Sequence, residues 1–149
     1  MRRTVICSLL VALASCQRGE EPLNLSGTWR LQFTGMQLGS VECDVTDMDV
    51  VFEHVGTSLA GLQTGTAHRV CRRNGVQIID NVFQGNMIAN GSVSGTTVTF
   101  TLAVVPGSTL AMNNIATGVV KGDSISGMAA WPDQQGSLSV HGGFSATRQ

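Results

Sequence analysis

The chain has little charge, no long hydrophobic run and no stretch with a clear helical period. Charged residues make up 13% of the sequence. The apolar segment Val5–Ala14 has ten residues, which is too few to span a bilayer as a helix. No stretch of a dozen residues keeps its apolar positions at the spacing of an amphipathic helix. Helical bundles and helical membrane spans are therefore not expected.

Basic residues are scarce as well. The formal net charge is −1, and without residues 1–15 the chain keeps seven basic and ten acidic residues, for a net charge of about −3. Proteins that bind nucleic acids use a basic patch, and this composition argues against one. The remaining 134 residues are the length of one domain and can bury a hydrophobic core.

Motifs of enzymes are also missing. The sequence has no Gly-x-Ser-x-Gly motif, and its glycine motifs lie between expected strands and not before a helix, which disfavours a phosphate-binding loop. His68 and His141 have no Ser or Cys partner at a recognisable spacing. We therefore expect a protein that is not an enzyme and has no cofactor.

Five acidic residues lie between Glu42 and Glu53 and raise the question of a metal site. The glycine turn and regular acidic spacing of an EF-hand are absent. Alternation places Asp47, Asp49 and Glu53 on the outward face of a strand. We therefore expect a solvated acidic surface and no metal.

The N-terminus is the most specific feature that is present. Arg2 and Arg3 precede the apolar segment, and Leu13-Ala14-Ser15-Cys16 ends it. This run resembles the lipobox of bacterial lipoproteins, in which a lipid is attached to the Cys and the preceding residues are removed. The resemblance implies a signal peptide at 1–15, lipidation of Cys16 and a lipidated tether at 16–24. A plain secretory signal and an uncleaved anchor are the alternatives.

The same resemblance implies a location. Mature bacterial lipoproteins carry three acyl chains, and several chains make membrane anchoring stable. We expect the protein to be held in the bacterial cell envelope through this lipid. Gln17, which follows the Cys, favours the outer membrane over the inner one.

Cys43 and Cys71 remain once Cys16 carries the lipid. An exported chain meets an oxidising compartment, so a disulfide between them is the simplest expectation. Two free buried thiols are the alternative. Zinc is disfavoured, because the two cysteines have no His at ligand spacing.

Residues 25–149 alternate apolar and polar side chains in short runs, which is typical of half-buried antiparallel strands. In the clearest run, residues 97–104, the apolar side chains share one face and three Thr and an Ala take the other. Four groups of residues each share a face: Val98, Phe100, Leu102 and Val104; Trp29, Leu31 and Phe33; Met48, Val50, Phe52 and His54; Leu138, Val140, Phe144, Ala146 and Arg148.

Turn residues separate these runs. Asn74-Gly75 predicts a two-residue hairpin turn, because both positions require positive φ. Further breaks are predicted at Ser94-Gly95, Gly107-Ser108 and Lys121-Gly122-Asp123. We predict an all-β fold, an antiparallel up-and-down meander barrel of eight to ten strands at 25–149, with a β-sandwich as the alternative. Arg69, Arg72 and Arg73 flank the first turn; a soluble edge is expected there, and lipid headgroups are the alternative contact.

The first and last strands resemble those of the lipocalins and related calycin barrels. Ser26-Gly27-Thr28-Trp29 is similar to their Gly-x-Trp signature, and Arg148 stands where a late Arg packs across that Trp. The resemblance implies barrel closure by Trp29 and Arg148. The chain departs from the family in lacking a Thr-Asp-Tyr motif and any Tyr, so the tyrosine-containing ligand sites of the avidin-like and fatty-acid-binding branches are not implied.

Two residues are candidates for a ligand site at the barrel mouth. Trp131 ends a strand before Pro132, and His54 lies on an apolar face, where a core or rim histidine is the alternative. We expect a non-catalytic cell-envelope lipoprotein with a structural or protein-interaction role and no nucleic-acid partner. The alternative function is binding of a small hydrophobic ligand inside the barrel.

Overall fold

The computed structural model describes residues 23–85, 87–104, 114–132 and 138–149. These residues form ten strands and no helix that is long and apolar enough to cross a membrane. The strands are β1 (Gly27–Leu38), β2 (Val41–Val55), β3 (Ser58–Thr64), β4 (Thr66–Arg73), β5 (Val76–Gln84), β6 (Met87–Ser94), β7 (Thr97–Val104), β8 (Asn114–Lys121), β9 (Ser124–Pro132) and β10 (Leu138–Arg148).

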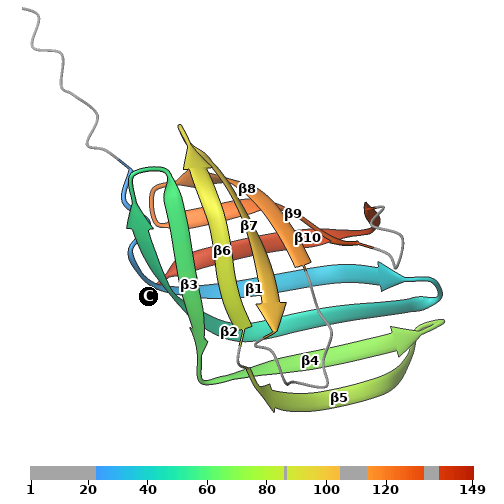
Figure 1. Cartoon of the computed structure of the whole chain (residues 1–149). Coiled ribbons are helices and arrows are strands. Elements are labelled where there is room, and N and C mark those ends of the chain that lie inside the picture. Colours follow the sequence, from blue (N-terminus) through green and yellow to red (C-terminus); the bar gives the residue numbers. More distant parts are fainter. Residues whose placement is uncertain (1–22, 86, 105–113, 133–137) are drawn as a thin grey trace, which may run out of the picture.

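Eight of the strands close a barrel (Figure 1). Neighbours follow the order β1-β10-β9-β8-β7-β6-β3-β2, and β1 pairs with β2 to complete the circuit. Every pairing is antiparallel. The predicted all-β, up-and-down barrel is confirmed, and the alternative sandwich is not formed.

The β4–β5 hairpin, residues 66–84, lies outside this circuit. β2 is long enough to have two partners on one side: residues 49–55 pair with β3, and residues 41–46 pair with β4. Asp47, with a φ of 57°, lies between the two segments. β3 then pairs directly with β6, so the hairpin extends the sheet beyond the barrel wall.

The turn of this hairpin is the one that its residues predict. Asn74 and Gly75 have φ values of 50° and 79°, which is the left-handed conformation of a two-residue hairpin turn. The turns predicted at Ser94-Gly95 and Lys121-Gly122-Asp123 are also present, whereas Gly107-Ser108 lies outside the described residues.

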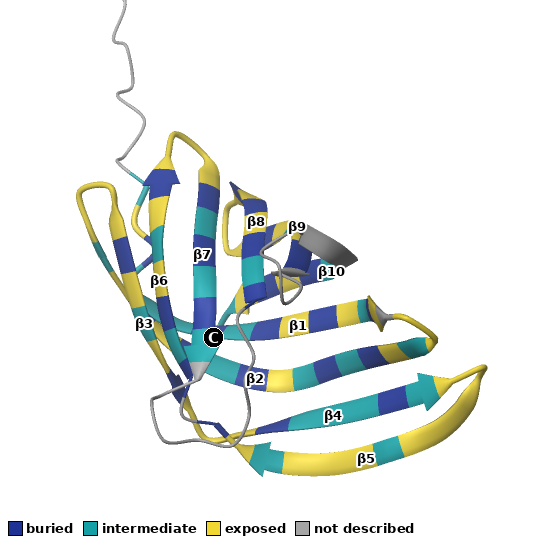
Figure 2. Cartoon of the chain, turned by 45° about the vertical axis from the view of Figure 1, so that its right-hand side comes forward, coloured by how far each residue is buried: buried dark blue, intermediate teal, exposed yellow. Residues whose placement is uncertain are grey.

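Four phenylalanine side chains meet in the middle of the barrel. Phe33 contacts Phe144, Phe144 contacts Phe100, and Phe100 contacts Phe52, with ring centroids 5.5, 5.3 and 5.5 Å apart. All four are buried, and the predicted alternation is visible in Figure 2 as buried positions that alternate with exposed ones. The side chains of Val104, Leu138 and Val140 lie outside the described part of the chain.

Glycines on neighbouring strands make room for these rings. A Cβ atom on Gly61 would lie 2.7 Å from the Phe52 ring, and one on Gly91 would lie 2.5 Å from Cβ of Phe100. Large side chains on some strands therefore face small residues on others, as the interior of a small barrel requires. Where these four rings meet, they occupy the barrel interior.

A disulfide joins the hairpin to the barrel. Cys43 of β2 and Cys71 of β4 stand directly opposite each other, and the structure forms the bond between them, which confirms the predicted bridge. Both residues are buried. The bond fixes β4 to the segment of β2 that does not pair with β3.

We expect the double variant C43A/C71A to lose about 3 kcal/mol of unfolding free energy, because the bridge closes a loop of 28 residues. The effect should be largest in the hairpin. Amide hydrogen exchange should accelerate in β4 and β5 well before it does in β6 to β9. Urea denaturation and exchange measurements on both proteins check this, and unchanged protection of the hairpin would contradict it.

Candidate functional site

The structure brings Trp29 and Arg148 together at one end of the barrel, which we call the base. Trp29 is fully buried, and the guanidinium carbon of Arg148 lies 4.7 Å from the centre of its ring. The indole nitrogen donates a hydrogen bond to the Leu25 carbonyl at 2.8 Å. Arg148 donates to the carbonyls of Ser26 and Asn24 at 2.7 and 2.6 Å. The base is therefore closed by contacts between the two ends of the domain.

His54 also belongs to the base, which corrects the expectation that it lies at the mouth. Its Nδ1 accepts a hydrogen bond from the backbone N–H of Leu25 at 3.3 Å, and its own N–H donates to Oγ of Ser26 at 3.0 Å. The end of β2 that carries His54 runs beside the start of β1, which alternation alone does not reveal. The histidine helps to hold the incoming chain.

Trp131 lies toward the other end of the barrel. It pairs with Val140 near the start of β10, whereas Thr147, near the end of β10, pairs with Ser124 close to the base. The Trp131 side chain and the loop after Pro132 lie outside the described residues. The position agrees with a mouth, and the orientation of the indole is not described.

The acidic residues of β2 are partly paired with arginines on the outer face of the sheet. Asp49 accepts two hydrogen bonds from Arg30, at 2.9 and 3.1 Å, and Asp44 accepts one from Arg72 at 2.9 Å. The hydrogen bond and the negative charge of Asp49 raise the pKa of Arg30 above its usual value. Within the described ranges, no three His, Cys, Asp or Glu side chains come close enough to hold a metal ion.

Two buried amides inside the barrel were not singled out from the sequence. Gln63 of β3 and Asn114 of β8 are 4% and 3% exposed. Neither amide atom of Gln63 has a hydrogen-bond partner in the described structure, and the Asn114 oxygen has none either. Both residues take inward positions in their strands. A polar residue at a position where alternation predicts a core residue is the sequence signal that could have identified them.

Within the described part of the chain, β5 has a free edge. Among the described residues, β5 pairs only with β4. Val76, Ile78 and Val82 are 67%, 46% and 64% exposed. Edge strands of natural proteins usually carry charged residues, especially Lys, or Pro, which prevent pairing with other chains. β5 has neither Lys nor Pro.

The single charged side chain of β5 contacts its neighbours within the hairpin. Oδ1 of Asp80 lies 2.7 Å from Nε2 of His68, and its Oδ2 accepts a hydrogen bond from Gln77 at 3.1 Å. Arg69 lies across the opposite face of the strand: its Nε donates to Asn81 at 3.3 Å, and its guanidinium carbon is 5.9 Å from the centre of the Phe83 ring. The outer face of the edge thus exposes Ile78 and Val82, and the inner face carries the guanidinium of Arg69 beside Phe83.

Comparisons with known proteins assign no relative. No model of a known protein family matches this chain, and no curated protein matches it. The function therefore has to be inferred from the base, the barrel interior and the β5 edge.

We expect Arg148→Ala to lower the free energy of unfolding by about 2 kcal/mol, because it removes a cation–π contact and hydrogen bonds to backbone carbonyls. Arg30→Ala is the matched control. It removes an arginine of β1 that forms a partly exposed ion pair with Asp49, and it should change the free energy of unfolding much less. Urea denaturation measures both, and equal effects of the two changes would contradict the proposed role of the base contact.

Proposed function

We propose that this protein is a non-catalytic, lipid-anchored component of the bacterial cell envelope that binds a protein partner through the free edge of β5. The observation that carries the proposal is this edge, which exposes apolar side chains on a hairpin fixed to the barrel by a disulfide. A preformed edge offers backbone donors and acceptors to an added strand, while neighbouring side chains select its sequence.

The rigidity of the hairpin supports a binding role. An isolated two-stranded hairpin is marginally stable in water, whereas β4 is held by pairing with β2 and by the Cys43–Cys71 bond. Ile79 and Phe83 also pack against the barrel core. The edge is therefore ordered before a partner arrives, so little conformational entropy remains to be lost on binding.

The proposed lipid anchor suits this surface. The described chain begins at Leu23 and enters at the base, where Leu25 contacts His54 and Trp29. Leu23 comes seven positions after Cys16, a span of at most about 25 Å. The Asn74-Gly75 turn is at the opposite end, because Arg73 pairs with Val41, at the end of β2 far from His54. In Figure 1 the start of the described chain and this turn lie on opposite sides, so an anchored molecule would present the hairpin away from the membrane.

A lipocalin-like domain that binds a small hydrophobic ligand is the second candidate. The eight-stranded barrel and the contact of Trp29 with Arg148 support this family likeness. Gln63 and Asn114 favour a ligand, because two inward amides without partners could bind its polar group. Such binding would not depend on Ile78 or Val82, which distinguishes it from the first candidate.

Cys16→Ala should release the protein from the membrane, because the substitution removes the proposed lipid attachment site. Cell fractionation and immunoblotting should find the wild-type chain in the outer-membrane fraction and the variant in the soluble periplasm. Mass spectrometry of the mature N-terminus should detect the attached lipid directly. Equal membrane retention of both proteins would refute the anchor.

The β5 interface can be tested in intact cells with a photo-cross-linker at Gln84. The double variant Ile78→Lys/Val82→Lys should lose at least about 80% of the wild-type cross-links, because edge lysines prevent strand addition. Val55→Lys is the matched control, since Val55 is 68% exposed but lies near the base. The identity of the cross-linked protein follows from mass spectrometry. Cross-links that survive the double variant, or that fall equally in V55K, would count against the interface.

A further inference from the structure

The two faces of the β5 edge differ in chemistry. Cys71 and Ala67 are buried inward residues of β4, so Arg69 between them belongs to the same inner face. Arg69 is paired with Asn81 in register and reaches over β5 to Phe83. On the outer face, Val82 is 64% exposed, and Asp80 beside it contacts His68 and Gln77. An added strand would therefore meet a cation on one face and an apolar side chain on the other.

The positive charge of Arg69 is not compensated within the described structure. Residues 66–84 contain three arginines and one aspartate. Asp80 is bonded by His68 and Gln77, and Arg72 pairs with Asp44 of β2. The described contacts of Arg69 are neutral, namely the Asn81 amide and the Phe83 ring. This guanidinium can therefore bind a carboxylate without breaking an existing ion pair.

We propose that the free edge of β5 binds an extended segment of a partner protein in which acidic and apolar residues alternate. This inference rests on the proposed function and specifies the partner's chemistry. Neighbouring strands lie about 4.8 Å apart and their side chains alternate between faces, so one set of side chains would meet Arg69 and the other set Val82. Carboxylates suit the first position and apolar side chains suit the second.

A second copy of this chain fits the edge less well. Two antiparallel β5 strands around a two-fold axis would keep both inner faces on the same side of the sheet. The inner face of β5 carries Ile79, Asn81 and Phe83, none of which is acidic. The two Arg69 side chains would then approach each other without a carboxylate between them. The charge distribution therefore favours a foreign acidic strand.

The test uses the purified mature protein and two eight-residue peptides, one alternating Glu and Val and the other alternating Lys and Val. Titration calorimetry at low ionic strength should give at least about tenfold tighter binding of the Glu–Val peptide, because only its carboxylates complement Arg69. Amide exchange should slow in β5 and not in β8 or β9. Equal affinities, or binding without protection of β5, would overturn the inference.

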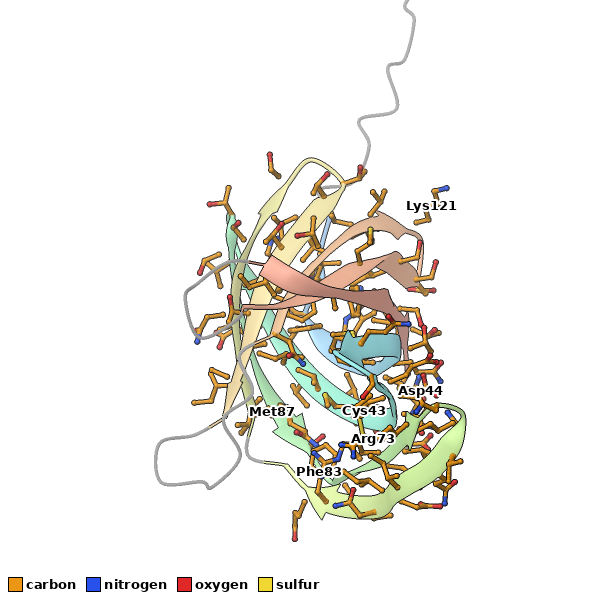
Figure 3. All side chains as sticks on the ribbon, turned by 90° about the vertical axis from the view of Figure 1, so that its right-hand side faces the viewer. Cys43, Asp44, Arg73, Phe83, Met87 and Lys121 are labelled. Atoms are coloured by element: carbon orange, nitrogen blue, oxygen red, sulfur yellow. A yellow bond between two sulfur atoms is a disulfide. The ribbon has the colours of Figure 1, made fainter. Side chains whose placement is uncertain are left out.

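Two charge-neutralising variants sharpen the result. Arg69→Gln keeps a side chain that can bond Asn81 but removes the cation, so the Glu–Val peptide should bind about tenfold more weakly to it. Lys121→Gln removes a cation at the end of β8, far from Phe83 in Figure 3, and should leave the affinity unchanged. An equal loss in both variants would show only a general charge effect and would overturn the inference.

Other outcomes separate this inference from the function on which it rests. If ultracentrifugation shows a dimer that Ile78→Lys abolishes, a second copy occupies the edge and the inference is wrong. If cross-links in cells depend on Ile78 and Val82 while the two peptides bind equally, the interface stands and the acidic partner is wrong. If the Glu–Val peptide protects β5 but cells give no cross-link, the strand chemistry stands and the cellular role is wrong.

Discussion

The pairing of β1 with both β10 and β2 is the contact on which the rest of the structure depends. It joins the two ends of the domain and removes the sheet edges that an open meander would leave. It also aligns Trp29 with Arg148, so that one guanidinium covers the indole and holds the incoming backbone. The closed base and the phenylalanine core follow from this closure, because inward residues on all eight strands then face one interior.

The same closure explains why the β4–β5 hairpin stands apart. β2 must pair along its whole length with β1, yet β3 covers only the half of β2 near the base. The other half would be an unpaired edge without β4, which transfers that edge to β5. The Cys43–Cys71 bond then stabilises an extension that has less core beneath it than the barrel has. The open edge of the sheet therefore lies on β5, the strand through which we propose that a partner binds.

Much of the fold could be predicted because its signals are local. Alternation assigned the inward faces of Phe52 and Phe100, and Asn74-Gly75 identified a turn through the backbone conformation it requires. The export signal that we expect at residues 1–15 implied an oxidising compartment, and this expectation suggested the disulfide. The change of partner along β2 could not be predicted, because alternation states which face a side chain takes and not which strand lies beside it. His54 was misplaced for that reason.

The candidate surface could not be predicted from the sequence either, since β5 mixes apolar and polar residues as an ordinary half-buried strand does. Only the pairing order shows that one side of it is open and that Ile78 and Val82 are exposed. The three arginines beside the turn could not be ranked from the sequence either. In the structure Arg72 is bound by Asp44, whereas Arg69 lies over a neutral strand at the open edge. The distinction between a paired and an uncompensated cation therefore comes from the strand register, and the acidic partner that we propose depends on it.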